Sequence, residues 1–181
     1  MLFTISSAYQ WKDRTTNKST NSETALKEIV AQVNNYFKKR KLTNKDSYLI
    51  NYKRLRATAG NNMLESIINR IKTSNVVIID ITHPNENVFL ELGIAIGLIS
   101  SGCCPFNLYL IKDITNSKNV IENLPSDLQG FFISGYTIQS GKAVFKDNGS
   151  LRMNIIGDVK EYYDILVKPI DSIDEINHYD Q

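Results

Sequence analysis

The chain has 181 residues, of which 42% are hydrophobic and 22% are charged, and its formal net charge at pH 7 is +2. This length suits one domain, and the hydrophobic fraction is enough for a proper core. The nearly balanced charge argues against a protein that coats nucleic acid and against an acidic tail. The sequence pI is near 8.4, so the slightly positive chain would not repel an anionic nucleotide.

The first half of the chain alternates strand and helix patterns. A short apolar strand over 2–5 is followed by a polar loop over 12–22. Thr20 and Glu23 then form a capping-box pattern, and apolar residues recur at helical spacing as far as Phe37, which predicts an amphipathic helix. The basic run after Phe37 is interpreted as a solvated helix end, because cations complement the helix dipole there. A strand over 48–52 and a helix over 63–71 follow.

The segment over 75–98 is the most informative part of the sequence. Val76 to Ile79 is a β-branched run closed by Asp80, which is typical of a strand buried on both faces of a parallel sheet. The apolar helix predicted over 88–98 has no polar stripe, so we expect it to be covered nearly all round. Glu91 is the one acid inside it. Since burying an unpaired carboxylate is costly, we expect Glu91 to face a cleft.

The second half of the chain continues the alternation. Gly102 suits a helix stop, and a fourth strand is predicted over 106–111. A turn over 124–128 opens a short helix, a fifth strand covers 132–138, and turn residues over 147–150 precede a last helix over 151–166. The pattern predicts an α/β domain over 1–167, with a doubly wound, mostly parallel, five-stranded sheet of the flavodoxin-like kind, and a tail over 168–181.

The cysteines and the apolar segments predict a cytoplasmic location. Cys103 and Cys104 are the only cysteines, and sequence neighbours rarely form an unstrained disulfide, so a reducing compartment is favoured. The first residues lack the layout of a signal peptide, and the longest apolar stretch falls short of the roughly 20 residues that span a bilayer. We expect no membrane partner.

Candidate binding residues follow from the rule that open α/β sheets bind ligands at the carboxyl ends of their strands, where the strand order reverses. The residues expected after the first three strands share polar or aromatic side chains: Ser6, Ser7, Tyr9, Arg54, Asp80, Thr82, His83, Asn85 and Asn87. Arg56, Lys112 and Asp113 extend the same set. Tyr9 can stack on a base, or it can be a hydrophobic plug.

Glu91 is the predicted catalytic residue. If Asn85 or Asn87 caps the helix, Glu91 lies near its first turn, where the dipole favours an anion, so we expect a depressed pKa. An ionised carboxylate suits a nucleophile or a stabiliser of a cationic sugar, as in the cleavage of an N-glycosidic bond. The alternative is an acid held structurally by a buried arginine or by backbone amides.

Other kinds of site find little support in the sequence. The histidines and cysteines are scattered, so no metal site and no bound cofactor are predicted. Gly93 to Gly97 lies inside a helix and lacks the strand–turn–helix context of a dinucleotide fingerprint, so close packing explains it better. His83 can transfer protons, although a lone loop histidine is usually polar surface.

The central segment resembles the signature of bacterial TIR-like nucleotide-binding proteins, which are similar in fold to nucleoside 2-deoxyribosyltransferases. The resemblance rests on the strand over 74–82, on Asn85, Asn87 and Val88, on Glu91, Leu92, Gly93 and Ala95, and on 124–128 leading to Tyr136. It covers roughly residues 1–140. It implies a TIR-like fold and assigns the catalytic glutamate of both families to Glu91.

The resemblance implies cleavage of the nicotinamide–ribose bond of NAD, used as substrate, often in antiviral defence. A deoxyribosyltransferase-like reaction on nucleosides is the alternative, although the approach Asn-Glu-Asn-Val-Phe-Leu departs from the Asp-rich loop of those enzymes. A nucleotide-binding or adaptor domain without chemistry is the third. The implied partners are a nucleotide or nucleoside, further copies in a homo-oligomer, and a separately encoded defence partner; no nucleic acid is expected.

Overall fold

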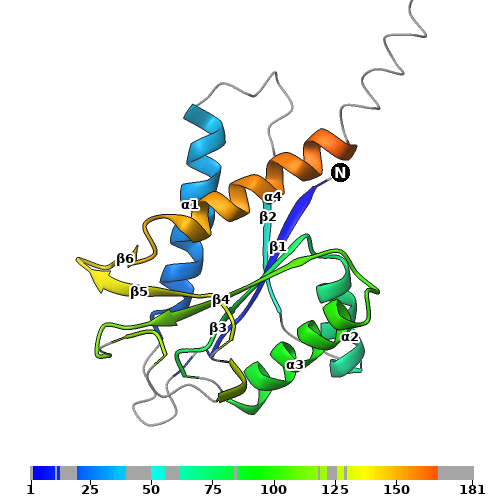
Figure 1. Ribbon diagram of the computed structural model, residues 1–181, viewed down its shortest axis with the longest axis horizontal. Coiled ribbons are helices and arrows are strands. Elements are labelled where there is room, and N and C mark those ends of the chain that lie inside the picture. The colour runs from blue at the N-terminus through cyan, green and yellow to red at the C-terminus, as the bar shows by residue number, and fades with distance from the viewer. Residues whose placement is uncertain are drawn as a thin grey trace, which may run out of the picture.

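The computed structural model describes residues 2–10, 12, 20–39, 50–55, 62–83, 85–117, 119–121, 126–128 and 130–166. Helices and strands alternate along the chain (Figure 1). Their bounds are β1 Phe3–Ala8, α1 Ser22–Lys39, β2 Ile50–Arg54, α2 Met63–Lys72, β3 Val76–Asp80, α3 Glu86–Ser100, β4 Asn107–Asp113, η1 Ser126–Leu128, β5 Ile133–Gln139, β6 Lys142–Phe145 and α4 Ser150–Leu166. The predicted tail over 168–181, Arg56 and part of the predicted turn over 124–128 lie outside the described residues.

The strands form one sheet in the order β2-β1-β3-β4-β5-β6. The pairs from β2 to β5 are parallel and the β5–β6 pair is antiparallel. The prediction of an α/β fold with a mostly parallel sheet is therefore confirmed. The chain runs outward in opposite directions from β1 and β3, so the strand order reverses between these two neighbours, which is where such sheets usually bind ligands.

The prediction of five strands was wrong, because β6 adds a sixth. Gln139 pairs with Lys142 across a two-residue turn made of Ser140 and Gly141. Both turn residues have positive φ, 49° and 76°. This conformation matches the twist of a tight hairpin, and a Ser-Gly pair is a recognised signal for it.

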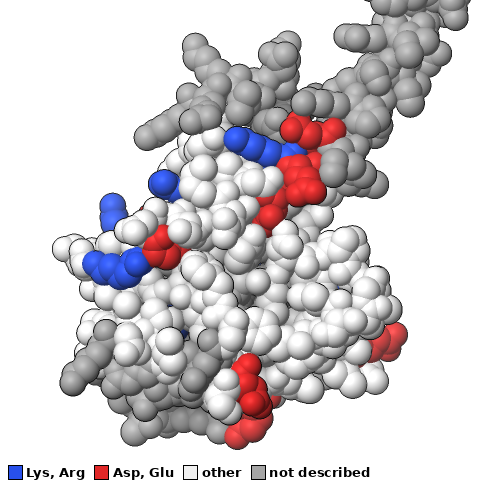
Figure 2. Space-filling view, viewed as in Figure 1, with Lys and Arg blue, Asp and Glu red and all other residues white. Residues whose placement is uncertain are grey.

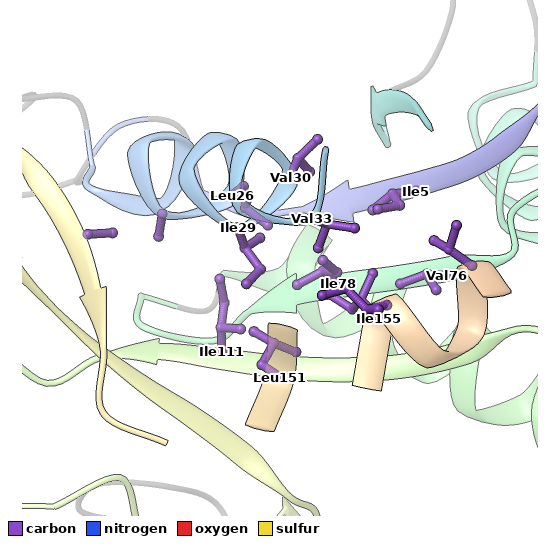
Figure 3. Packing of buried hydrophobic residues seen from close by; sticks show 14 of the residues in the cluster. Ile5, Leu26, Ile29, Val30, Val33, Val76, Ile78, Ile111, Leu151 and Ile155 are labelled. Carbon is purple, nitrogen blue, oxygen red and sulfur yellow. The ribbon is translucent and has the colours of Figure 1, made fainter. Parts of the chain in front are cut away.

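Two hydrophobic cores lie on the two faces of the sheet. Helices α1 and α4 cover one face, and α2 and α3 cover the other (Figure 1). Because successive side chains of a strand point to opposite faces, Ile78 enters the α1/α4 core while Ile79 enters the α2/α3 core. Figure 3 shows Leu26, Ile29 and Val33 of α1 packed over the strand residues of the first core.

The strand β3 is buried along its whole length, as its β-branched run predicts. It lies between β1 and β4, so its backbone is paired on both edges and its side chains are covered on both faces. The carboxyl end of this central strand is Asp80, and α3 begins six residues later.

The expectation that α3 would be covered nearly all round was wrong. Val88, Glu91, Leu92 and Ala95 are buried, but Phe89 and Leu90 remain 41% and 45% exposed. The helix lies in an outer layer, so the sheet covers only one side of it (Figure 1). The predicted helix stop is confirmed: α3 ends at Ser100, and Gly102 has a φ of +65°. Among the described helices, none has both the length and the apolar character needed to cross a membrane.

Candidate active site at the carboxyl edge of the sheet

Glu91 enters from the buried side of α3. The predicted cap at Asn85 is present: its side-chain oxygen accepts a hydrogen bond from the Val88 backbone N–H at 2.9 Å, which satisfies one of the free donors at the helix start. Glu91 is the sixth residue of the helix and is only 7% exposed. The helix thus carries a carboxylate inward, close to the end of β3 where the helix begins.

The expected depression of the Glu91 pKa was wrong in direction. Burial raises its pKa to about 7, and the positive charge of Arg54 opposes the rise without cancelling it. Removal from water disfavours the charged form, and at the sixth position the helix dipole has largely faded. Near neutral pH the carboxyl group is therefore divided between its acid form and its carboxylate.

Arg54 is the cation of the site. It is the last residue of β2, and its guanidinium donates to the Tyr9 backbone oxygen at 3.2 Å while lying 4.3 Å from the centre of the Tyr9 ring. The ring face and the carbonyl together hold the planar guanidinium. Tyr9 is only 7% exposed, so its role here is to position Arg54.

Ser7 and Tyr52 form a separate pair at the same edge of the sheet. Their hydroxyls are hydrogen bonded at 2.9 Å, and burial raises the pKa of Tyr52 to about 12. The Leu55 backbone N–H donates to the Ser7 carbonyl at 2.6 Å, which prolongs the pairing of β1 with β2. Ser7 and Tyr52 project toward the α1/α4 face, whereas Glu91 belongs to the other face; the charge of Arg54 acts on both Tyr52 and Glu91.

Sequence reasoning missed Tyr52, Glu23 and Lys27. Glu23 and Lys27 form an ion pair at 2.6 Å in the first two turns of α1, and Glu23 influences the pKa of Tyr52. Glu23 lies in the first turn of α1, but the predicted capping box was wrong: α1 begins at Ser22, and the Thr20 hydroxyl donates to the Gln10 carbonyl. No pattern marked Tyr52, whose place depends on how β2 is paired with β1.

Asp80 and Thr82 lie in a buried network instead of facing an open site. The Asp80 carboxylate accepts hydrogen bonds from the Tyr136 hydroxyl at 2.6 Å and from the Thr82 backbone N–H at 2.8 Å. The hydroxyls of Thr82 and Ser22 add two more. Burial raises the pKa of Asp80, and these donors oppose the rise. Thr82 in turn accepts from the Asp113 backbone N–H at 2.7 Å, so the network joins the ends of β3 and β4 to the middle of β5 and to α1.

The remaining predicted binding residues, Ser6, His83, Asn85 and Asn87, are not shown in contact with Glu91 or Arg54. Ser6 was expected after the first strand, but it lies within β1, and its hydroxyl is hydrogen bonded to that of Ser74 at 2.7 Å on the α2/α3 side. β1 runs on to Ala8 because it is paired on both edges. His83 and Asn87 are exposed at the start of α3, and Asn85 serves as the cap.

The site contains carboxylates, hydroxyls and one guanidinium. Within the described residues, no three His, Cys, Asp or Glu side chains are grouped in a way that could hold a metal ion. No family model, curated protein or solved structure matches the chain. The likeness to TIR-like proteins therefore rests on the residues quoted above and stays a prediction.

Proposed function

We propose that this protein cleaves an N-glycosidic bond in NAD or a closely related nucleotide, with Glu91 as the catalytic residue. The observation that supports this most is a buried carboxyl group near the carboxyl edge of a parallel sheet, whose pKa is raised to about 7 and which the positive charge of Arg54 influences. Strongly perturbed acids in such positions cluster at functional sites. The resemblance of the segment around Glu91 points to the same bond.

The proposed reaction is a hydrolysis. The bond between the ribose anomeric carbon and the nicotinamide nitrogen breaks, and its electron pair goes to the nitrogen, which neutralises the pyridinium. The positive charge left on the sugar is stabilised by the Glu91 carboxylate, either through space or as a transient ester. Water then forms a new bond from its oxygen to the anomeric carbon and releases one proton to solvent. If the ester has formed, the bond between the anomeric carbon and the Glu91 oxygen breaks in this step, and its electron pair returns to the carboxylate.

The substrate itself would set the charge of Glu91. A nicotinamide ring linked to ribose is cationic, and a cation close to a carboxyl group favours ionisation, so binding of NAD would draw Glu91 to its carboxylate form. Arg54 provides a positive charge of the kind that holds a pyrophosphate, and the contacts to Tyr9 keep its guanidinium in place.

A second candidate, cleavage or transfer on a neutral nucleoside, is favoured by the same raised pKa. A protonated Glu91 can donate its proton to a leaving base, which a permanently ionised carboxylate cannot do. The two candidates therefore differ in the form of Glu91 that reacts.

The test is to incubate the purified protein with NAD and, separately, with a panel of ribo- and deoxyribonucleosides, and to resolve the products by chromatography. Free nicotinamide from NAD is the expected result. The variant Glu91→Gln should lose activity by about 100-fold or more, as removal of a charge-stabilising group often does. Glu86→Gln is the matched control, because Glu86 is an exposed acid of the same helix and should leave turnover unchanged.

Three outcomes count against the proposal. Full activity of Glu91→Gln with an unchanged melting curve would remove Glu91 from the chemistry. Base release from nucleosides alone would favour the second candidate. Tight binding of NAD without any product would favour a domain that only binds nucleotides.

A further inference from the structure

The outer surface of α3 is apolar and uncharged. Five residues at helical spacing face away from the core and are exposed; they are Phe89, Leu90, Gly93, Gly97 and Ser100, and we call them the outer α3 face. After Glu86, the only charged residue of the helix is Glu91, on its buried side. Figure 2 shows a largely uncharged surface over α2 and α3, with acidic side chains at its margins. Apolar surface of this kind on an outer helix is typical of an interaction site.

Packing within the described part of the chain does not require the two glycines of this face. A Cβ added at Gly93 or Gly97 would meet nothing within 4 Å. Glycine lowers helix stability relative to alanine, so a glycine in an exposed helix with open space around it needs another reason. Bare backbone lets a second helix approach closely.

We propose that the outer α3 face pairs with the same face of a second copy of this chain, with the two α3 helices antiparallel about a two-fold axis at Gly93. In this arrangement Phe89 of each copy lies over Gly97 of the other, and the two Gly93 residues meet. Phe89 and Gly97 are each four residues from Gly93. A two-fold axis at Gly93 therefore places the Phe89 ring of one copy against the bare backbone at Gly97 of the other. Such self-complementarity is the mark of an isologous interface.

Charge favours a second copy over a different partner. The outer α3 face holds no charge of either sign, so two identical faces approach without repulsion even though the chain carries a net charge of +2. The helix α2, which packs against α3, carries the exposed apolar side chains of Met63 and Leu64 in its first turn, together with the exposed acid Glu65. The uncharged surface proposed for pairing is therefore that of α3 alone.

The pairing does not depend on the proposed catalytic function. Glu91 lies on the opposite side of the same helix, so the second copy supplies no residue to the candidate site. Loss of the dimer and loss of catalysis are therefore separate observations.

The first experiment measures the dissociation constant of the full chain by sedimentation velocity over a range of concentrations, at low and high salt. A dimer whose stability changes little with salt is expected, because the interface is uncharged. Gly97→Gln and Gly93→Gln should weaken it by about tenfold or more. Gly157→Gln is the matched control, because Gly157 is an exposed glycine of α4 with equally open space around it. A wild-type monomer at all concentrations, or an equal loss in the control, would overturn the proposal.

The second experiment tests the axis. In a chain whose Cys103 and Cys104 are replaced by serine, Gly93→Cys should form a disulfide-linked dimer under mild oxidation, since the axis brings the two copies of this residue together. Glu86→Cys should not, because antiparallel helices hold the two copies of residue 86 far apart. Cross-linking at 86 and not at 93 would show that the face pairs differently or not at all.

Discussion

Asp80 and Glu91 are two buried acids at the same edge of the sheet, and they differ in what surrounds them. Asp80 is 2% exposed and receives hydrogen bonds from Tyr136, Thr82 and Ser22. Glu91 is 7% exposed, and within the described part of the chain its carboxylate accepts no hydrogen bond and senses only the charge of Arg54. Both acids are buried, Asp80 more completely than Glu91, but only Asp80 is held by several hydrogen bonds. This difference separates an acid that stabilises the fold from one that is available for chemistry.

The largest effect on stability is expected from Asp80→Ala. Its loss leaves the buried Tyr136 hydroxyl and two donors of Thr82 without an acceptor, so the free energy of unfolding should fall by about 3 kcal/mol or more. Urea denaturation measures this, with the exposed Asp127→Ala as control. If Asp80→Ala lowered the free energy of unfolding only slightly, Asp80 would not stabilise the fold more than Glu91 does.

The ionisation of Glu91 should be visible in the pH dependence of the free energy of unfolding. Its pKa rises from 4.5 to about 7 on folding, so its favourable contribution is complete below pH 4.5 and is lost as the pH rises through about 7. Allowing for partial screening by water, this loss amounts to about 2 kcal/mol. Glu91→Gln should flatten this part of the profile, as denaturation at a series of pH values would show, whereas an unaltered slope would contradict it.

The pH profile of turnover should distinguish the two candidate reactions. If the Glu91 carboxylate stabilises the sugar cation of NAD, kcat/KM should rise about tenfold per pH unit below the pKa of about 7 and level off above it. If the protonated acid serves a neutral nucleoside, kcat/KM should fall over the same range. A flat profile with either substrate would argue against both roles.

The smallest effect is expected from Tyr52→Phe. This change removes only the hydroxyl that pairs with Ser7, and the free energy of unfolding should fall by about 1 kcal/mol, since one part-buried hydrogen bond is lost. If Tyr52→Phe lowered the free energy of unfolding as much as Asp80→Ala does, Tyr52 would matter to the stability of the fold as much as the Asp80 network. Thermal unfolding of the two variants side by side gives the comparison.

Sequence patterns predicted those features of the carboxyl edge of the sheet that depend on residues close together in the sequence. The buried strand β3 and the Asn85 cap follow from residues within a few positions of one another. The cleft that Glu91 was expected to face stays a prediction. The Ser140-Gly141 turn was also present in the sequence, but its meaning depends on the strand after it, which is only four residues long.

Features set by distant parts of the chain could not be predicted. The Ser7–Tyr52 hydrogen bond follows from the register of β1 with β2, and Ser6 was misplaced because pairing on both edges prolongs β1. The pKa of Glu91 depends on a balance between the helix dipole and burial, and only the folded structure gives the burial.

The Asp80 network also bears on the order in which the protein folds. Thr82 is two residues away and can bond to Asp80 in an isolated turn, but Tyr136 is 56 residues away and arrives only when β4 and β5 have joined β3. Until then the Asp80 carboxylate is better solvated by water, so we expect Asp80 to become buried after the folding transition state. Mutations at Asp80 should accordingly accelerate unfolding far more than they slow folding, with φ-values close to zero.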